Sequence, residues 1–404
     1  MEKILFERNI PVTASADVVV AGGGLGGVAA ALAAARAGAS VILTETNGFL
    51  GGVATAGMCC SVFNCMFSRE RELLVKGIPL EIVDALAVGA GPGMSWRKHK
   101  GHMIYDVEKG KLVLADLLEK EGVQVRLNSP VTDVIKEGDR VTHLVTSGKN
   151  GLEAIGCGVM VDATGDCDAI ALAGVPFRNA ESNAASYVFR LGNVDVDRFV
   201  DYLCENPQEY PGKMDIDWSL EEAVAQYREN GTFLFPHGGG MQMTQIRRAV
   251  TNGDLPQEKG RYTTLDAMQM HLIRDERVCH VITGYVGNKD LDAKELTASI
   301  NEGKRIAFLF NDMMRKYMPG FENSFVNQTA DDLGIRGSRC IVGESRFTRD
   351  MKEAAYRCRD AAGVGVIETH IKLESAENAW SAQVFGDDVW EGSKNHCRSF
   401  RCTE

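Results

Sequence analysis

Three apolar segments follow one another near the start of the chain, between Asp17 and Glu45. "DVVV" and "SVILTE" are short and rich in β-branched residues, which is typical of strands buried in a parallel sheet. Between them lies an alanine-rich segment that starts in a run of glycines and ends at Gly38, a residue type that favours a helix C-terminus. The pattern therefore predicts a strand, a helix and a second strand, the repeating unit of α/β proteins.

The same stretch has to be compared with a membrane span, because residues 18–35 carry no charge and come close to the roughly twenty apolar residues that a span requires. Five glycines lie among the first ten positions of the stretch, and few large apolar side chains follow Leu32. The preceding residues mix acids with bases and offer no positive cluster of the kind that a secretion signal carries. We therefore expect neither a membrane span nor a signal peptide.

A phosphate-binding turn explains this stretch better. Gly22, Gly24 and Gly27 have G-x-G-x-x-G spacing between the predicted strand and helix, and Glu45 ends the second strand about twenty residues later. In such a turn the first glycine permits the sharp bend, the second admits a pyrophosphate, and the third lets the helix pack on the strand. The free N–H groups of the helix N-terminus bind the anion. Glu45 is placed to accept hydrogen bonds from a ribose, so the segment predicts dinucleotide binding.

Further apolar patterns extend the predicted α/β unit. A second glycine pair, Gly51 and Gly52, is placed to follow the pyrophosphate of a longer cofactor. Leucines at helical spacing predict a helix over residues 111–122. Short apolar runs separated by turn residues predict strands over residues 123–127, 131–135, 141–146 and 158–163.

Composition narrows the class of protein. The 404 residues have 45% hydrophobic content, which is enough for a large core, and the net charge is −11. That charge argues against a nucleic-acid or anionic-membrane partner. The eleven cysteines are scattered along the chain, an odd count that favours reduced thiols and a cytoplasmic location.

Three segments together resemble a known family. "VVVAGGGLGGVAAALAAARAGASVILTE", "GFLGGVATAG" and "VMVDATGDCDAIALAGVPF" are similar to the FAD-dependent oxidoreductases with the glutathione-reductase-type two-dinucleotide-binding fold. Members of this family are commonly grouped with the FAD subunit of heterodisulfide reductase. The later segments "ELTASINEGKRI", "MPGFENSFVNQTADDLGIRGSRCIVGE" and "FGDDVW" are similar to the second half of the family, so the resemblance covers almost the whole chain.

The resemblance implies which residues contact FAD. Gly22, Gly24 and Gly27 would hold the pyrophosphate, Glu45 the adenosine ribose, and Gly51 and Gly52 would lie along the cofactor. The remaining implied contacts are Val131 on the adenine side, Thr164, Gly165 and Asp166 over the adenosine half, and Arg336 and Arg339 near the flavin. A cation beside the flavin stabilises its anionic reduced form, which is a contribution of the protein to the cofactor chemistry. The alternative for both arginines is a surface ion pair.

The expected fold is α/β, with a Rossmann-like FAD-binding domain made of a parallel sheet and a β-meander, and with an inserted α+β substrate domain. We place the first part of the FAD-binding domain in residues 1–184, the insertion in 185–325 and the second part in 326–404. A long amphipathic helix is predicted over residues 295–318. After "FGDDVW" the resemblance implies a further strand, cofactor loop and helix that the sequence does not show, so we expect a truncated C-terminal segment.

Cysteines and histidines offer further candidates. Cys59, Cys60 and Cys65 follow the second glycine pair, where a redox pair and reduced structural thiols are the alternatives. No C-x-x-C occurs, so the spacing does not favour an iron–sulfur cluster, which is kept only through the family association. His280 lies in a predicted strand of the insertion as a candidate general acid or base, with a structural histidine as the alternative. We expect no metal site.

The sequence therefore predicts an FAD-dependent oxidoreductase that exchanges a hydride or electron pair with a small organic substrate and with an unidentified electron donor or acceptor. No second G-x-G-x-x-G follows a strand, so we expect no built-in NAD(P)H domain. Three alternatives stay open: an NAD-dependent dehydrogenase, a truncated and inactive FAD-binding relative, and an electron-transfer subunit with iron–sulfur partners.

Overall fold

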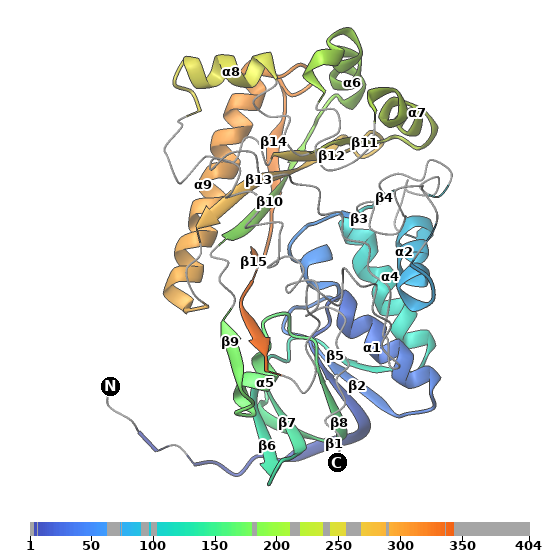
Figure 1. Cartoon of the computed structure of the whole chain (residues 1–404), viewed down its shortest axis with the longest axis vertical. Helices are drawn as coiled ribbons and strands as arrows, with labels where there is room; N and C mark the ends of the chain where they lie inside the picture. Colours follow the sequence, from blue (N-terminus) through green and yellow to red (C-terminus); the bar gives the residue numbers. More distant parts are fainter. Residues whose placement is uncertain are drawn as a thin grey trace, which may run out of the picture.

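The computed structural model of the chain contains two large sheets, one above the other, with helices beside each (Figure 1). The structure describes residues 4–5, 7–62, 73, 75–89, 97, 103–179, 184–210, 219–236, 243–255, 268–287, 291–335 and 337–342. Arg336, Cys65 and the segment "FGDDVW" lie outside the described residues.

The first sheet has six strands in the order β5-β2-β1-β8-β7-β6. Its strands are β1 (Val12–Ala21), β2 (Val41–Thr44), β5 (Gln124–Arg126), β6 (Val131–Glu137), β7 (Arg140–Gly148) and β8 (Gly151–Asp162). β1 runs parallel to β2 and β8, and β2 runs parallel to β5, whereas β6, β7 and β8 form an antiparallel meander. The expected Rossmann-like arrangement of a parallel sheet with a meander is confirmed.

Both faces of this sheet are covered, which explains the unbroken apolar runs in its central strands. On one face Val20 packs with helices α1, α2 and α4, and on the other Val19 and Ala21 pack with α5. The helices are α1 (Leu25–Arg36), α2 (Ile78–Gly89), α4 (Val107–Lys120) and α5 (Asp168–Leu172). The predicted strand-helix-strand unit is thus β1, α1 and β2.

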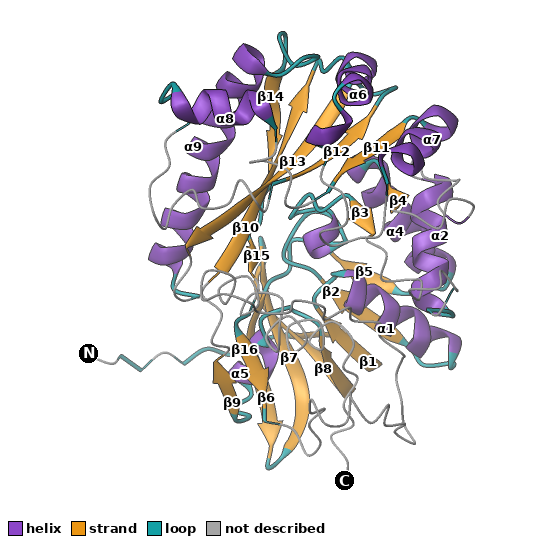
Figure 2. Cartoon of the chain, turned by 45° about the horizontal axis from the view of Figure 1, so that its top comes forward, coloured by secondary structure: helices purple, strands orange, loops and turns teal. Residues whose placement is uncertain are grey.

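The second sheet is antiparallel, with the order β11-β12-β13-β10-β14 and with β15 paired to β10. Its strands are β10 (Ala184–Gly192), β11 (Thr232–Phe235), β12 (Gln269–Ile273), β13 (Val278–Gly287), β14 (Phe325–Thr329) and β15 (Gly334–Ile335). Four helices flank it (Figure 2): α6 (Val196–Glu205), α7 (Leu220–Asn230), α8 (Thr244–Thr251) and α9 (Ala293–Tyr317). The helix predicted over residues 295–318 is confirmed as α9.

The two faces of the second sheet differ in chemistry. Phe189 and Tyr187 of β10 point toward α9: the Phe189 ring lies 6.3 Å from that of Phe310, and Tyr187 packs against Gly303. On the same face Phe233 of β11 packs against Phe199 of α6, with ring centroids 6.4 Å apart. Because side chains alternate along a strand, the neighbouring residues point away from these helices. We call this second face the inner face.

Short elements connect the two sheets. β3 (Ser61–Val62) pairs with β4 (Met103–Ile104), and β9 (Phe177–Asn179) pairs with β16 (Arg339–Ile341). A single-turn helix, η1 (Gly52–Ala54), precedes β3, and another, η4 (Pro207–Glu209), follows α6. β14 and β15 belong to the second sheet, although the sequence analysis placed residues 326–404 in the second part of the FAD-binding domain. The domain bounds stay a prediction.

Within the described ranges, no helix combines the length and apolar character that crossing a bilayer requires.

The close approach of α9 to β10 generates a stability prediction. A Cβ atom at Gly303 would lie 2.4 Å from Cγ of Tyr187, a 0%-exposed side chain in the middle of β10. We expect Gly303→Ala to lower the free energy of unfolding by about 1–3 kcal/mol through overpacking, measured by urea denaturation. The control is Gly110→Ala in α4, where the nearest atoms are ends of side chains at 3.3 Å and the change should stay within about 1 kcal/mol. Equal effects of the two substitutions would contradict the prediction.

Candidate functional site

The glycine-rich turn at the carboxyl end of β1 is the centre of the candidate site. Gly22 has φ +101°, a conformation that favours glycine, and a Cβ there would lie 2.4 Å from the carbonyl oxygen of Ala163. At Gly27 a Cβ would lie 1.9 Å from the carbonyl oxygen of Gly22. The glycine-rich turn and the first helical turn of α1 are therefore in backbone contact. Only glycine at positions 22 and 27 permits this contact.

Gly24 has a different environment. It is the N-cap of α1, its φ is −62°, and no side chain caps the helix. A Cβ built on Gly24 would meet no atom within 4 Å, so open space lies directly before the helix. The N–H groups of a first helical turn have no intrahelical partner and carry a partial positive charge. The end of α1 is therefore shaped to bind a phosphate through its backbone.

A second glycine loop lies against this turn. Gly51 N–H donates to the carbonyl oxygen of Gly23 over 2.8 Å, and Gly24 and Gly51 form a parallel bridge. A Cβ on Gly52 would lie 3.1 Å from Cα of Gly24. Gly51 and Gly52 both have positive φ, at +117° and +54°. The sequence-predicted glycines thus form one continuous backbone surface beside the open end of α1.

Glu45 lies at the end of β2, next to the turn, and is buried. One carboxylate oxygen accepts from Gly23 N–H at 2.7 Å, and the other accepts from Asn47 N–H at 2.8 Å. Burial raises the pKa of Glu45, and the nearby Asp332 adds to that rise. Each oxygen keeps a second lone pair, so a hydroxyl group can still donate to this carboxylate.

The segment before β6 borders the same region. Ser129 N–H donates to the carbonyl oxygen of Glu45 at 2.8 Å, and Asn128 N–H donates to that of Asn47 at 3.0 Å. Val131, two residues later, begins β6 and is half-buried. The structure therefore brings the backbone around Val131 to the edge of the glycine turn.

The turn after β8 closes the other side. Ala163 N–H donates to Ala21 O at 2.7 Å, which holds Thr164 and Gly165 beside Gly22. Asp162, which the sequence analysis missed, accepts from the Thr164 hydroxyl at 2.7 Å and from Ile170 N–H at 2.8 Å. This carboxylate fixes the turn and the start of α5. Burial raises the pKa of Asp166, the last residue of the predicted turn.

This backbone cradle has the shape that a dinucleotide pyrophosphate requires. Gly22 and Gly27 permit the close backbone contacts, open space lies at Gly24, and no side chain caps the N-terminus of α1. A model of the family described as FAD dependent oxidoreductase matches residues 17–396. The chain belongs to this family. FAD is the cofactor that the family membership indicates, and the expected oxidoreductase class is confirmed at that level.

Solved structures show similarity at low identity. A geranylgeranyl bacteriochlorophyll reductase-like protein from Thermoplasma acidophilum is 18% identical, with 83% of this chain and 68% of that chain covered and a TM-score of 0.44. The p-nitrophenol 4-monooxygenase of Pseudomonas putida is 14% identical, with 83% and 71% covered and a TM-score of 0.41. A myxobacterial chondrochloren halogenase is 14% identical, with 82% and 66% covered and a TM-score of 0.44. A search of curated proteins found no match.

For this FAD-dependent oxidoreductase, the sequence also predicted two arginines near the flavin. Arg339 lies on β16, and its guanidinium donates to Asp168 Oδ1 at 2.7 Å and to the carbonyl oxygen of Asp166 at 3.1 Å. This arginine therefore fastens β16 to the turn that follows β8. Its flavin contact stays a prediction, and Arg336 lies outside the described residues.

His280 lies on β13 and is completely buried. Its side chain belongs to the inner face of the second sheet, because its neighbours Cys279 and Val281 pair with Leu191 and Phe189 on the helix-covered face. Burial and the nearby Arg190 lower the pKa of His280 to about 3, so the imidazole is neutral at physiological pH. A role as general acid or base stays a prediction.

A buried polar cluster on the inner face was missed by the sequence analysis. His271 of β12 lies between Cys60 and Ser61: its Nδ1 is 3.4 Å from Cys60 Sγ, and its Nε2 is 3.2 Å from Ser61 Oγ. Burial raises the pKa of Cys60 well above its usual value, so this cysteine is a thiol. Within the described ranges, no group of three His, Cys, Asp or Glu side chains is arranged to hold a metal.

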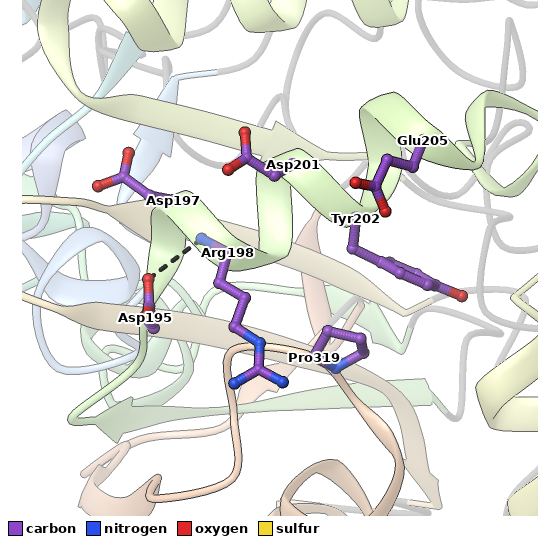
Figure 3. A pocket seen from close by; sticks show the side chains of 7 residues that line it. All are labelled: Asp195, Asp197, Arg198, Asp201, Tyr202, Glu205 and Pro319. Carbon is purple, nitrogen blue, oxygen red and sulfur yellow. Dashed lines mark hydrogen bonds between the residues drawn. The ribbon is translucent and has the colours of Figure 1, made fainter.

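A surface cavity with a volume of about 560 Å³ lies beside α6 (Figure 3). Its lining residues are Asp195, Asp197, Arg198, Asp201, Tyr202, Glu205 and Pro319. The four carboxylates would repel a pyrophosphate, so this cavity does not suit the cofactor.

Two carboxyl groups meet where the two sheets join. Asp106 is the N-cap of α4, and Glu276 lies in the turn between β12 and β13 and shares a hydrogen bond with it. Burial and the Asp106 charge raise the pKa of Glu276 to about 7, while Lys109 and Arg190 oppose that rise. The carboxyl pair therefore holds a proton in the folded protein that the unfolded chain releases near its ordinary value of 4.5.

Stability should depend on pH through this pair. Because the folded pKa is raised, its contribution is complete below pH 4.5 and is lost as pH rises through about 7. We expect Glu276→Gln, which keeps a neutral donor at every pH, to be more stable than the wild type by about 1–3 kcal/mol at pH 8 and nearly equal at pH 4.5. Urea unfolding at several pH values measures the difference. A difference that does not vary with pH would contradict the assignment.

Proposed function

We propose that the protein is a flavoenzyme that binds FAD in the backbone cradle of β1 and α1 and exchanges an electron pair, as a hydride, with a small organic substrate. The open space at Gly24 before the uncapped N-terminus of α1 is the observation that carries the proposal. Gly22 and Gly27 keep the turn tight, while Gly51 and Gly52 add a second backbone surface beside it. Together these five glycines would bind the pyrophosphate without any side chain.

The adenosine half of FAD would occupy the edge of the first sheet. Glu45 is proposed to accept from the ribose through its remaining lone pairs, and the backbone near Val131 to border the adenine. Thr164, Gly165 and Asp166 would close over this half, with Asp162 holding their turn in place. The position of each residue around the cradle supports these proposed contacts.

When bound, FAD supplies the chemistry of electron-pair transfer, and the chain supplies binding, orientation and exclusion of water. Gly52 lies in η1, and the chain runs directly from there to Cys60 and Ser61 at the inner face of the second sheet. Asp331 N–H donates to Ala56 O at 2.9 Å, which ties the second sheet to this segment. We propose that the substrate is held between this segment and the inner face, and that a separate donor or acceptor completes the cycle.

The proposal is tested by two glycine substitutions in the same motif. Gly24→Ala places a methyl group in the space for the pyrophosphate, and we expect it to weaken FAD binding at least about tenfold, since one lost hydrogen bond to a charged group is worth about 1.5–3 kcal/mol. The stability of the flavin-free protein should change by no more than about 1 kcal/mol, the range of N-cap effects. Titration of flavin-free protein with FAD, followed by fluorescence quenching, measures the affinity.

Gly27→Ala is the matched control. Its Cβ would lie 1.9 Å from Gly22 O, so the flavin-free protein should lose about 1–3 kcal/mol of stability from overpacking. Wild-type FAD affinity in Gly24→Ala would show that the pyrophosphate binds elsewhere. A wild-type protein that takes up no FAD would overturn the proposed function.

A further inference from the structure

The inner face of the second sheet carries a row of polar side chains. His271 of β12 is paired with His280 of β13, and His280 is paired with Arg190 of β10, so the three side chains lie side by side across three strands. Gln269, two residues before His271, points to the same face. β3 lies next to this part of the sheet (Figure 2), and its Ser61 contacts His271. The row therefore faces the first half of the molecule.

Several polar atoms in this row have no hydrogen-bond partner among the described residues. They are Oε1 and Nε2 of Gln269, Nδ1 and Nε2 of His280, and Nε of Arg190. Gln269 and His280 are both 0% exposed. Buried polar atoms are nearly always hydrogen-bonded, because leaving them unpaired costs free energy. His271 in the same row is satisfied by Cys60 and Ser61, whereas Gln269 on the same strand and His280 and Arg190 on the next two strands carry the unpartnered atoms.

The unpartnered groups share a chemical preference. Arg190 is half-buried, and within the described residues its guanidinium makes one hydrogen bond, to Asn327 Oδ1 at 3.0 Å, and no ion pair. Glu276 is close enough for its charge to interact with that of Arg190, but Glu276 shares a hydrogen bond with Asp106, and Lys109 pairs with Asp106 at 3.5 Å. A cation, an imidazole and an amide thus lie on one face of the sheet, and the cation forms no ion pair within the described residues.

We propose that Arg190, His280 and Gln269 form a binding site for a carboxylate group of the organic substrate. Arginine forms paired hydrogen bonds with carboxylates, and the neutral imidazole and the amide each add a donor. The amide oxygen of Gln269 and the second imidazole nitrogen remain as acceptors for a neighbouring hydroxyl group. The inference rests on the proposed function, because it names the substrate class of the same flavoenzyme site.

The experiment measures the melting temperature of the full-length protein with acetate, pyruvate or benzoate, against acetamide, benzamide and sodium chloride at equal concentration. Binding to the folded state raises the melting temperature by mass action. We expect at least one carboxylate to raise it and its uncharged amide to have no effect. Gln269→Met and Arg190→Gln should each weaken the fitted affinity for that carboxylate at least about tenfold.

Gln226→Met is the matched control for Gln269→Met. Gln226 is also buried, but its Nε2 donates to Thr232 Oγ1 at 3.1 Å. Without ligand, Gln226→Met should therefore lower the melting temperature, and Gln269→Met should leave it unchanged or raise it. With ligand, Gln226→Met should keep the carboxylate response.

Two results would overturn the inference: no response to any of the three carboxylates, or a loss of stability in Gln269→Met as large as that in Gln226→Met. The second result would mean that buried water already satisfies Gln269. FAD content is measured on the same samples. Protein that binds FAD but no carboxylate refutes only the inference, and protein that binds carboxylate but no FAD refutes the proposed function.

Discussion

The backbone contact between Gly27 and the carbonyl oxygen of Gly22 is the constraint on which the cofactor end of the molecule depends. A methyl group at position 27 would lie 1.9 Å from that oxygen, so α1 can start directly above the end of β1 only because both residues are glycines. This close start leaves the helix N-terminus pointing into open space at Gly24. The second glycine loop and the turn after β8 then pack around the same point, held by backbone hydrogen bonds of 2.7–2.8 Å. The cradle is thus built from main-chain atoms, and side chains such as Asp162 act by fixing the loops.

The two faces of the second sheet carry different side chains. Toward the helices it presents aromatic and aliphatic side chains such as Phe189 and Phe233, which form the larger apolar core. Toward the first half of the molecule it presents His271, His280 and Arg190. Because strand residues alternate between faces, the same three strands pack apolar side chains against the helices and carry this polar row, with Val188 and Ile282 beside it, on the other face. This division lets the polar row vary in chemistry without disturbing the side chains that pack against the helices.

The fold was largely predictable from the sequence, because its signals are local. β-Branched runs, glycine spacing and an amphipathic pattern identified β1, α1, β2 and α9 before any tertiary contact was known. The polar cluster could not be found in this way, because Cys60 and His271 are separated by 211 residues and no spacing rule links them. His280 was singled out, whereas its neighbour His271 was not, since two histidines on adjacent strands become a pair only through the register of β12 and β13. The carboxyl pair of Asp106 and Glu276 was not predicted either, because the two residues lie far apart in the sequence and meet only in the folded chain.

Residues late in the chain hold the segment that contains the second glycine loop, so this part of the fold is completed only when distant segments meet. Asp331 and Asp332 both donate their N–H groups to Ala56 O, and the Asn47 amide donates to Asp332 Oδ2 at 3.2 Å. β1, α1 and β2 are synthesised within the first 44 residues, but the loop that covers their phosphate cradle gains these partners only after residue 332 has left the ribosome. Until then the loop lacks these three hydrogen bonds. The packing of this loop therefore depends on the segment between β14 and β15, which lies far from it in sequence.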